Sequence, residues 1–197
     1  MARTAKIARK NKETNIELDL ALDGEGRCDI STGIGFFDHM LNHVGRHGLF
    51  DLRVRAQGDL HIDGHHTVED VGICLGKALL EAVGEPTGLV RFGHAVVPMD
   101  EALAEVALDF SGRPMLVFNA EVSKERVGEL DVELVEEFMQ AFAANARVTL
   151  HVGLRYGTNA HHGIEAIFKA FGRALRTAVE LDARVKGVPS TKGMLEA

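Results

Sequence analysis

Two copies of one short motif, His-His-x-x-Glu, place metal-binding side chain types close together. The copies read His65-His66-Thr67-Val68-Glu69 and His161-His162-Gly163-Ile164-Glu165. On a helix, residues three and four positions apart share a face, so each Glu can converge with either His of its copy. Adjacent histidines lie about 100° apart around the helix axis, so they cannot easily bind the same ion. The motif predicts a two-metal site in which neighbouring histidines serve different ions.

Each His-His pair is expected at the start of a helix, directly after a loop. The positive end of the helix dipole disfavours imidazolium and favours Glu there. Neutral imidazole and carboxylate are the forms that a metal ion binds. A single copy would most often be a solvated helix start, but core packing does not explain why both histidines and the glutamate recur. Nitrogen and oxygen ligands suit Zn, Fe, Ni or Mn, and ligand type alone does not choose among them.

The motif belongs to a longer internal repeat. Residues 64–83 match residues 160–179 at a shift of 96, and apolar residues at spacings of three and four predict an amphipathic helix in each. Upstream the shift is 98, where 52–56 match 150–154, and a weaker match sets 13–22 against 101–110.

This repeat predicts an α+β fold made by internal duplication of a half-domain. Each half is expected to have a mixed or antiparallel sheet covered by two helices. The halves, 1–90 and 91–197, are expected to pack as a pseudo-dimer in one compact unit.

The preceding helix of each half offers another candidate ligand. At the shift of 98, His39 aligns with Glu137, and both residue types can bind metal. Glu137 also lies in the acidic run 133–137, where it could simply be a surface acid.

Composition limits the class of partner. The formal net charge is -7, which argues against nucleic-acid binding. No apolar run approaches the ~20 residues that cross a bilayer, so no membrane partner is expected. The two cysteines form neither a CxxC motif nor a disulfide framework, so a cytoplasmic location is expected.

Because the chain is acidic, an anionic substrate must be met by a local basic cluster. Candidates are Arg91 and Arg113, each in a loop or turn, and the C-terminal segment 187–193, Gly-Val-Pro-Ser-Thr-Lys-Gly. Ser190, Thr191 and Lys192 within it offer two hydroxyls and an ammonium group beside backbone N–H donors. Such a set can bind phosphate through charge-assisted hydrogen bonds.

Seven segments in order resemble the signatures of imidazoleglycerol-phosphate dehydratase. They are 36–41 (Phe-Phe-Asp-His-Met-Leu), 64–70, 98–101 (Pro-Met-Asp-Glu), 111–114 (Ser-Gly-Arg-Pro), 145–151, 161–171 and 187–193. The resemblance runs from about Arg9 to Leu195. It implies a hydro-lyase of histidine biosynthesis that dehydrates D-erythro-imidazole-glycerol phosphate, a small phosphorylated imidazole, to imidazole-acetol phosphate. It also implies two Mn²⁺ ions per active site and a homo-oligomer, a 24-mer built from trimers, with active sites between subunits.

The resemblance further implies roles for individual residues. The metal ligands would be His39, His65, His66, Glu69, His161, His162 and Glu165. The eighth ligand of the family is commonly a His, but Glu137 stands at that position here. The substrate-binding residues would be Glu13, His39, His47, His65, Glu69, Arg91, Arg113, His161, Lys169, Ser190, Thr191 and Lys192. The catalytic carboxylates would be Glu13, Glu165 and Asp100, with His47 as a further acid–base candidate.

The expected mechanism begins with the substrate's imidazole ring. The proton on C2 of the glycerol chain is not acidic, so stabilisation of the imidazolate by a Lewis acid would assist loss of the C3 hydroxyl. Proton removal from C2 would then give an enol, which becomes the ketone. Two alternatives remain open at this point. One is a metal-dependent hydrolase, and the other is a non-catalytic metal-storage shell, which would leave Arg91 and Arg113 unexplained.

Overall fold

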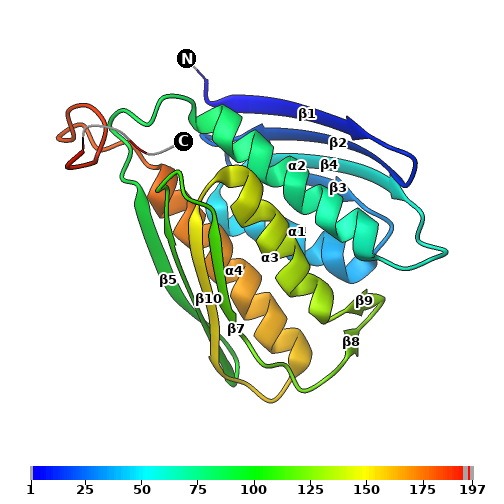
Figure 1. Ribbon diagram of the computed structural model, residues 1–197. Coiled ribbons are helices and arrows are strands. Elements are labelled where there is room, and N and C mark those ends of the chain that lie inside the picture. Colours follow the sequence, from blue (N-terminus) through cyan, green and yellow to red (C-terminus); the bar gives the residue numbers. More distant parts are fainter. Residues whose placement is uncertain (1, 193–194, 196–197) are drawn as a thin grey trace.

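Two four-stranded sheets enclose four long helices in the computed structural model, which describes residues 2–192 and 195 (Figure 1). The first sheet and its helices comprise β1 (Thr4–Lys10), β2 (Thr14–Ala21), β3 (Cys28–Ser31), α1 (Gly35–Gly48), β4 (Asp51–Gly58) and α2 (His65–Val83). The second group comprises β5 (Phe92–Met99), β6 (Ala102–Asp109), β7 (Met115–Asn119), α3 (Glu133–Ala146), β10 (Thr149–Tyr156) and α4 (Ala160–Val179). A small hairpin, β8 (Arg126–Val127) and β9 (Leu130–Asp131), precedes α3.

The two sheets have the same topology. Their strand orders are β1-β2-β4-β3 and β5-β6-β10-β7, and in each sheet the last strand pairs in parallel while the other pairs are antiparallel. Leu18 lies opposite Val54 in the first sheet, and Val106 lies opposite Val152 in the second. Leu18 and Val106 are 88 positions apart, which equals the shift of the weak match between 13–22 and 101–110. The two residues therefore occupy equivalent places in the two sheets. The predicted α+β fold with mixed sheets is confirmed.

The helices pair across the halves. In sequence order α1 and α2 belong to the first half, yet α1 packs on α4 and α2 packs on α3. A Cβ on Gly76 would lie 2.6 Å from the Phe142 carbonyl oxygen, and one on Gly172 would lie 2.8 Å from the Val44 carbonyl oxygen. These two contacts are related by the shifts of the repeat, so one close helix contact occurs twice. The halves therefore pack as a pseudo-dimer, whereas the boundary between residues 90 and 91 stays a prediction.

Phenylalanines fill the layer between the paired helices. Phe142 meets Phe171 edge-on with ring centroids 4.9 Å apart, and Phe37 meets Phe138 in the same way at 5.4 Å. All four rings are buried, and such aromatic pairs contribute about 0.5–1.5 kcal/mol each beyond their burial. This packing holds the helix starts, where the His-His-x-x-Glu copies lie, in fixed positions.

No sequence pattern marks the short strands β3, β7, β8 and β9. β3 and β7 have four and five residues, and their side chains alternate between half-buried and exposed. Each lies at a sheet edge and pairs in parallel with a strand distant in sequence. A short strand at an edge carries little hydrophobic pattern, so the sequence gives a weak signal for it.

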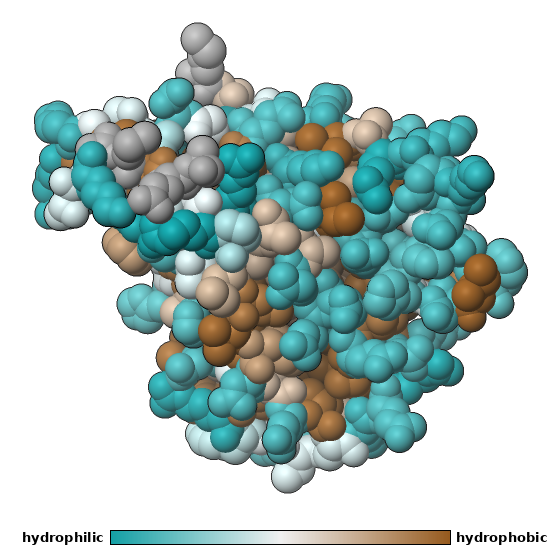
Figure 2. Space-filling view, viewed as in Figure 1, coloured by the Kyte–Doolittle hydropathy of each residue, from teal (hydrophilic) through white to brown (hydrophobic). Residues whose placement is uncertain are grey.

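The molecular surface differs between its regions. In the view of Figure 2, hydrophilic side chains dominate over β1, β2 and α2, whereas hydrophobic ones gather lower down, over β7, β10 and α4. Within the described part of the chain, no helix is long and apolar enough to cross a membrane.

Candidate active site

Both His-His pairs lie at helix starts, as their pattern predicts. α2 begins at His65, and α4 begins at Ala160, one residue before His161. The His65 backbone N–H donates to Oδ1 of Asp63 at 2.9 Å, and the His161 backbone N–H donates to Oδ1 of Asn159 at 3.0 Å. Each contact engages one of the backbone N–H groups that a helix start leaves unpaired. Asn159 is the N-cap residue of α4, whereas Asp63 precedes Gly64, the N-cap residue of α2. Positions 63 and 159, which correspond in the repeat, therefore make the same contact to the first turn of both metal-motif helices.

Glu165 is the centre of the densest cluster of ligand-type side chains. Its Oε2 lies 3.2 Å from Nε2 of His39 on α1 and 3.0 Å from Nε2 of His161. Its Oε1 lies 3.3 Å from Nε2 of His43 and 2.6 Å from Nζ of Lys169. Burial opposes ionisation of Glu165, but Lys169, His43 and His161 together outweigh burial and lower the pKa of this carboxyl to about 2. Glu165 is therefore ionised at neutral pH.

His43 is a residue to which the sequence pattern assigned no role. The ligand atoms of His39, His43 and Glu165 all lie within 4.8 Å of one another, close enough to meet at one metal ion. Burial lowers the pKa of His43 to about 4, which keeps this imidazole neutral at pH 7. Neutral imidazole and ionised carboxylate form a nitrogen and oxygen donor set, which can bind Zn, Fe, Ni or Mn. The role of His43 could have been predicted from the sequence, because the i, i+4, i+8 spacing of His39, His43 and His47 places them on one helix face.

His47 extends this row of histidines along α1. Its ring stacks on that of His43 with centroids 5.5 Å apart. It also lines a polar cavity of about 520 Å³ with Arg173 and Arg176. Burial, followed by the charge of Lys169, lowers the pKa of His47. The predicted substrate residues His47 and Lys169 thus lie at the same helix pair as Glu165.

The second histidine of each motif lies between two carboxylates. Nδ1 of His66 is 3.0 Å from Asp59 Oδ2, and its Nε2 is 3.9 Å from Glu13 Oε1. Nδ1 of His162 is 2.7 Å from Glu101 Oε2, and its Nε2 is 3.8 Å from Asp100 Oδ2. The predicted catalytic carboxylates, Glu13 and Asp100, therefore lie on the Nε2 side of the two rings. The sequence pattern gave no role to Asp59 or Glu101.

The remaining predicted ligands lie on the α2–α3 pair. A Cβ on Gly64, beside His65, would meet the side chain of Leu134 near the start of α3 at 3.2 Å. The starts of α2 and α3 therefore lie together, and Glu69 and Glu137 are each the fifth residue of their helix. Among the described residues no ion pair joins His65 to Glu69 as one joins His161 to Glu165. Metal binding by His65, Glu69 and Glu137 stays a prediction.

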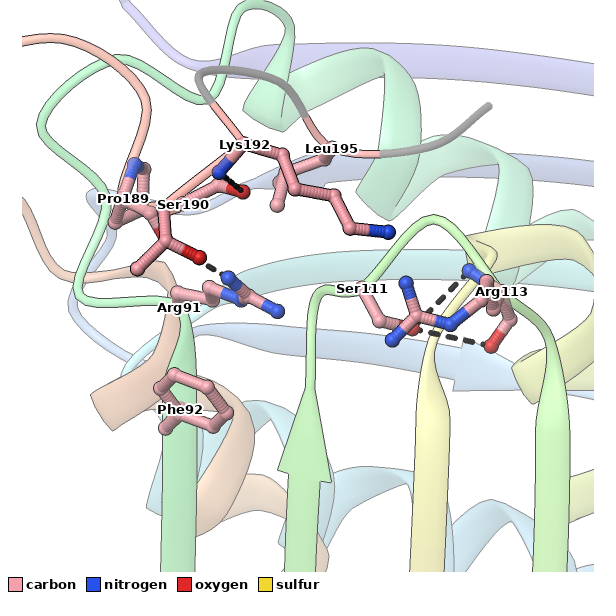
Figure 3. A pocket seen from close by; sticks show the side chains of 9 residues that line it. Arg91, Phe92, Ser111, Arg113, Pro189, Ser190, Lys192 and Leu195 are labelled. Carbon is pink, nitrogen blue, oxygen red and sulfur yellow. Dashed lines mark hydrogen bonds between the residues drawn. The ribbon is translucent and has the colours of Figure 1, made fainter.

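The five residues predicted to bind phosphate line one cavity of about 660 Å³: Arg91, Arg113, Ser190, Thr191 and Lys192 (Figure 3). Gly193, the last residue of the predicted loop, lies outside the described residues. Arg91 has a left-handed backbone with φ 76°, an uncommon conformation that often marks functional positions. Its guanidinium contacts Oδ1 of Asp109 at 2.6 Å and the Pro189 carbonyl at 2.7 Å. The cavity is thus a basic site that the C-terminal segment closes on one side.

The basic cavity and the histidine clusters lie at opposite ends of the second sheet. Arg91 precedes β5, and Asp100 follows it. Since β5 has 8 residues, at about 3.3 Å per residue its ends are roughly 23 Å apart. One small molecule cannot reach both ends of the strand in a single chain.

Comparison with known proteins gives a consistent result. Residues 32–175 match the family model described as imidazoleglycerol-phosphate dehydratase. The dehydratase of that name from Acetivibrio thermocellus is 60% identical over 195 residues, which cover 99% of this chain and 100% of the relative. The one from Bacillus licheniformis is 58% identical, covering 98% and 100%. A crystal structure of the Staphylococcus aureus enzyme matches with TM-score 0.83 and 45% identity, covering 91% of this chain and 99% of that one.

Proposed function

This chain belongs to the imidazoleglycerol-phosphate dehydratase family, and from that membership and the site geometry we propose that it dehydrates D-erythro-imidazole-glycerol phosphate to imidazole-acetol phosphate. It is an enzyme, a hydro-lyase of histidine biosynthesis. The observation that carries the proposal is the cluster of His39, His43 and Glu165 combined with a separate basic cavity. These are the two sites that an imidazole with a phosphate at its other end requires. The free cysteines, Cys28 and Cys74, fit a cytoplasmic location.

Two Mn²⁺ ions per active site are the cofactor that we propose. The donors that would hold them are His39, His65, His66, Glu69, Glu137, His161, His162 and Glu165. The low pKa of Glu165 and the absence of thiolates from this set favour a hard ion that accepts nitrogen and oxygen. When bound, the ions would act as Lewis acids that stabilise the imidazolate form of the substrate ring.

The chain's own carboxylates would then move the protons. Glu13 and Asp100 each lie on the Nε2 side of a motif histidine, at 3.9 Å and 3.8 Å from that atom. Both residues lie in hairpin turns. From such a turn, a carboxylate can extend to a bound substrate and contact its carbon or its hydroxyl group. Removal of the C2 proton and protonation of the departing C3 hydroxyl require one base and one acid. We assign these roles to carboxyl groups of Glu13, Asp100 and Glu165, of which Glu165, ionised at neutral pH, can act only as the base.

The basic cavity would hold the phosphate. Arg91, Arg113 and Lys192 supply positive charge, and Ser190 and Thr191 supply hydroxyl donors. The Asp109 carboxylate holds the Arg91 guanidinium through two hydrogen bonds, from Nε to Oδ1 at 2.6 Å and from Nη2 to Oδ2 at 3.0 Å. Fixing the guanidinium before the substrate arrives reduces the entropy that binding must remove.

We further propose that the active site forms between chains, in a 24-mer built from trimers. The separation of roughly 23 Å along β5 supports an active site in which the phosphate cavity of one copy serves the histidine cluster of another. The outer faces of the sheets also differ. The first sheet carries ion pairs such as Arg55–Asp29 and Arg53–Asp19, whereas the second exposes Phe92, Val96, Met115 and Val117. An exposed apolar sheet face of this kind suits contact with a second copy.

Incubation of Mn²⁺-loaded protein with imidazoleglycerol phosphate tests the reaction. We expect the ketone product, loss of turnover after chelation with EDTA, and its return when Mn²⁺ is restored. An assembled, Mn²⁺-loaded protein that forms no ketone would overturn the proposed reaction. Light scattering before and after EDTA tests the coupling of assembly to metal, and an unchanged mass on verified metal loss would exclude it.

A further inference from the structure

The second histidine of each metal motif has one ring nitrogen engaged by a carboxylate. Asp59 holds Nδ1 of His66 with both of its oxygens, at 3.0 Å and 3.2 Å. Glu101 holds Nδ1 of His162 with Oε2 at 2.7 Å. In each case the carboxylate can only accept, so Nδ1 must carry the proton. Nε2 of a neutral ring is then left with its lone pair available.

The two carboxylates come from unrelated places in the repeat. Asp59 lies in the loop between β4 and α2, while Glu101 lies in the turn between β5 and β6. Glu101 is also the residue that aligns with Glu13, which lies on the opposite side of its own histidine. A carboxylate therefore contacts Nδ1 of the second histidine in both halves, although the two carboxylates come from non-equivalent positions of the repeat. Because the repeat does not account for this recurrence, we infer that the contact has a function.

The Glu101 carboxylate is held by backbone N–H donors, and Asp59 is positioned by the turn that carries it. Oε1 of Glu101 accepts from the backbone N–H groups of Asn159 at 2.7 Å and Thr158 at 3.1 Å. Asp59 lies in a turn in which its carbonyl accepts from the Ile62 N–H at 2.8 Å, and its side chain is 14% exposed. Glu101 thus links the β5–β6 turn to the start of α4, and Asp59 links the end of β4 to the start of α2.

We propose that Asp59 and Glu101 are positioning residues that set the tautomer and ring orientation of His66 and His162, with Nε2 presented to the metal. A carboxylate bonded to the far nitrogen of a ligand histidine raises the basicity of the ligating nitrogen, and its loss typically weakens metal affinity about 10–100-fold. The proposal rests on the proposed function, because it takes His66 and His162 to be metal ligands.

Equilibrium dialysis of metal-stripped protein against Mn²⁺ tests the energetic part. Asp59→Asn and Glu101→Gln keep the size and the backbone contacts but remove the charge, so we expect each to weaken Mn²⁺ binding on the order of 10-fold or more. Asp63→Asn is the matched control, because it removes a charge three residues from His66 and creates the residue present at the corresponding position 159. We expect the control to bind Mn²⁺ like the unaltered protein. Unchanged affinity in the two variants, or an equal loss in the control, would overturn the proposal.

¹⁵N NMR of the metal-free protein with labelled histidine shows which ring nitrogen carries the proton. The variants His66→Gln and His162→Gln serve to assign the two signals. We expect the proton on Nδ1 of both rings above their titration range, and a mixture of tautomers at His66 in Asp59→Ala. A proton on Nε2 in the unaltered protein would overturn the proposal even if every variant folds poorly. Failure of the unaltered protein to bind Mn²⁺ would instead reject the proposed cofactor, so the two failures are distinguishable.

Discussion

The two halves of the molecule share the same arrangement of strands and helices but differ in the segments and side chains that surround it. Both have the same sheet topology, the same side-chain contact to the backbone at the helix start and the same glycine contact between paired helices. Both also have an Arg–Asp pair near the start of the first strand, Arg3 with Asp23 and Arg91 with Asp109. The two arginines correspond at the shift of 88, but Asp109 corresponds to Ala21 and not to Asp23. In the described part of the C-terminal segment, the Pro189 carbonyl accepts from Arg91, and there the basic cavity forms. A similar pair in the two halves is thus part of a cavity where the C-terminal segment lies over it.

The hairpin turns show a second difference. Glu13 and Glu101 are equivalent in the repeat, yet Glu13 lies on the Nε2 side of His66 and Glu101 binds Nδ1 of His162. In the first half, a buried network holds the turn, with Asp70 bound by Arg9, Asn11 and Thr14. The second half has Ala166 at the position of Asp70. Equivalent residues therefore need not have equivalent roles.

The largest expected effect is a loss of turnover in Glu13→Gln, and it distinguishes the role of Glu13 from that of Glu101. Glu13→Gln removes a proposed proton-transfer group, so we expect kcat to fall about 10²–10⁴-fold while Mn²⁺ affinity is retained. Steady-state turnover and Mn²⁺ dialysis on the same sample measure both. Full turnover with intact metal content would remove Glu13 from the mechanism.

A smaller effect is expected from Asp70→Asn. Asp70 is 3% exposed and accepts from Nε of Arg9 at 2.7 Å, and hydrogen bonds to charged groups contribute about 1.5–3 kcal/mol each. We expect urea denaturation of metal-free protein to show a loss of about 2 kcal/mol. Asp182→Asn, which alters the ion pair with the exposed Arg184, is the control and should cost clearly less, because solvent screens such surface pairs. Equal losses in the two variants would contradict the role given to the network.

The smallest effects are expected from the duplicated glycines. Alanine normally favours a helix over glycine by about 1 kcal/mol, but at Gly76 and Gly172 its Cβ would lie within 2.8 Å of a carbonyl oxygen. Overpacking typically costs about 1–3 kcal/mol, so both variants should be less stable by a similar net amount. Gly35→Ala, where nothing lies within 4 Å, should be neutral or stabilising. A clear loss at only one of the two sites would show that the halves do not pack alike.

The repeat made much of the fold predictable. Its apolar spacing predicted the two long helices that begin at His65 and Ala160, and the composition of the C-terminal segment predicted the basic cavity. Both features are local in sequence. The pairing of α1 with α4 is not local, because it depends on which buried faces fit together across the halves.

Several site residues were unpredictable for the same reason. Asp59 and Glu101 have no distinctive spacing from the histidines that they contact, and Glu101 is 61 residues from His162. His43 lies one turn from His39, but only the packing of α1 on α4 brings it to Glu165. The repeat would also have assigned Glu13 and Glu101 the same role, which the geometry does not support.

We propose that the phosphate cavity and the metal cluster of one active site belong to different copies of the chain. Arg91→Ala disables the cavity, and Glu165→Gln disables the metal cluster, so each variant alone should be nearly inactive. Co-expression of the two in one cell forms mixed assemblies in which an intact cavity of one copy meets an intact cluster of another. We predict that dehydratase turnover of these mixed assemblies rises well above that of either variant. Turnover that stays at the level of the separate variants in verified mixed assemblies would contradict the claim.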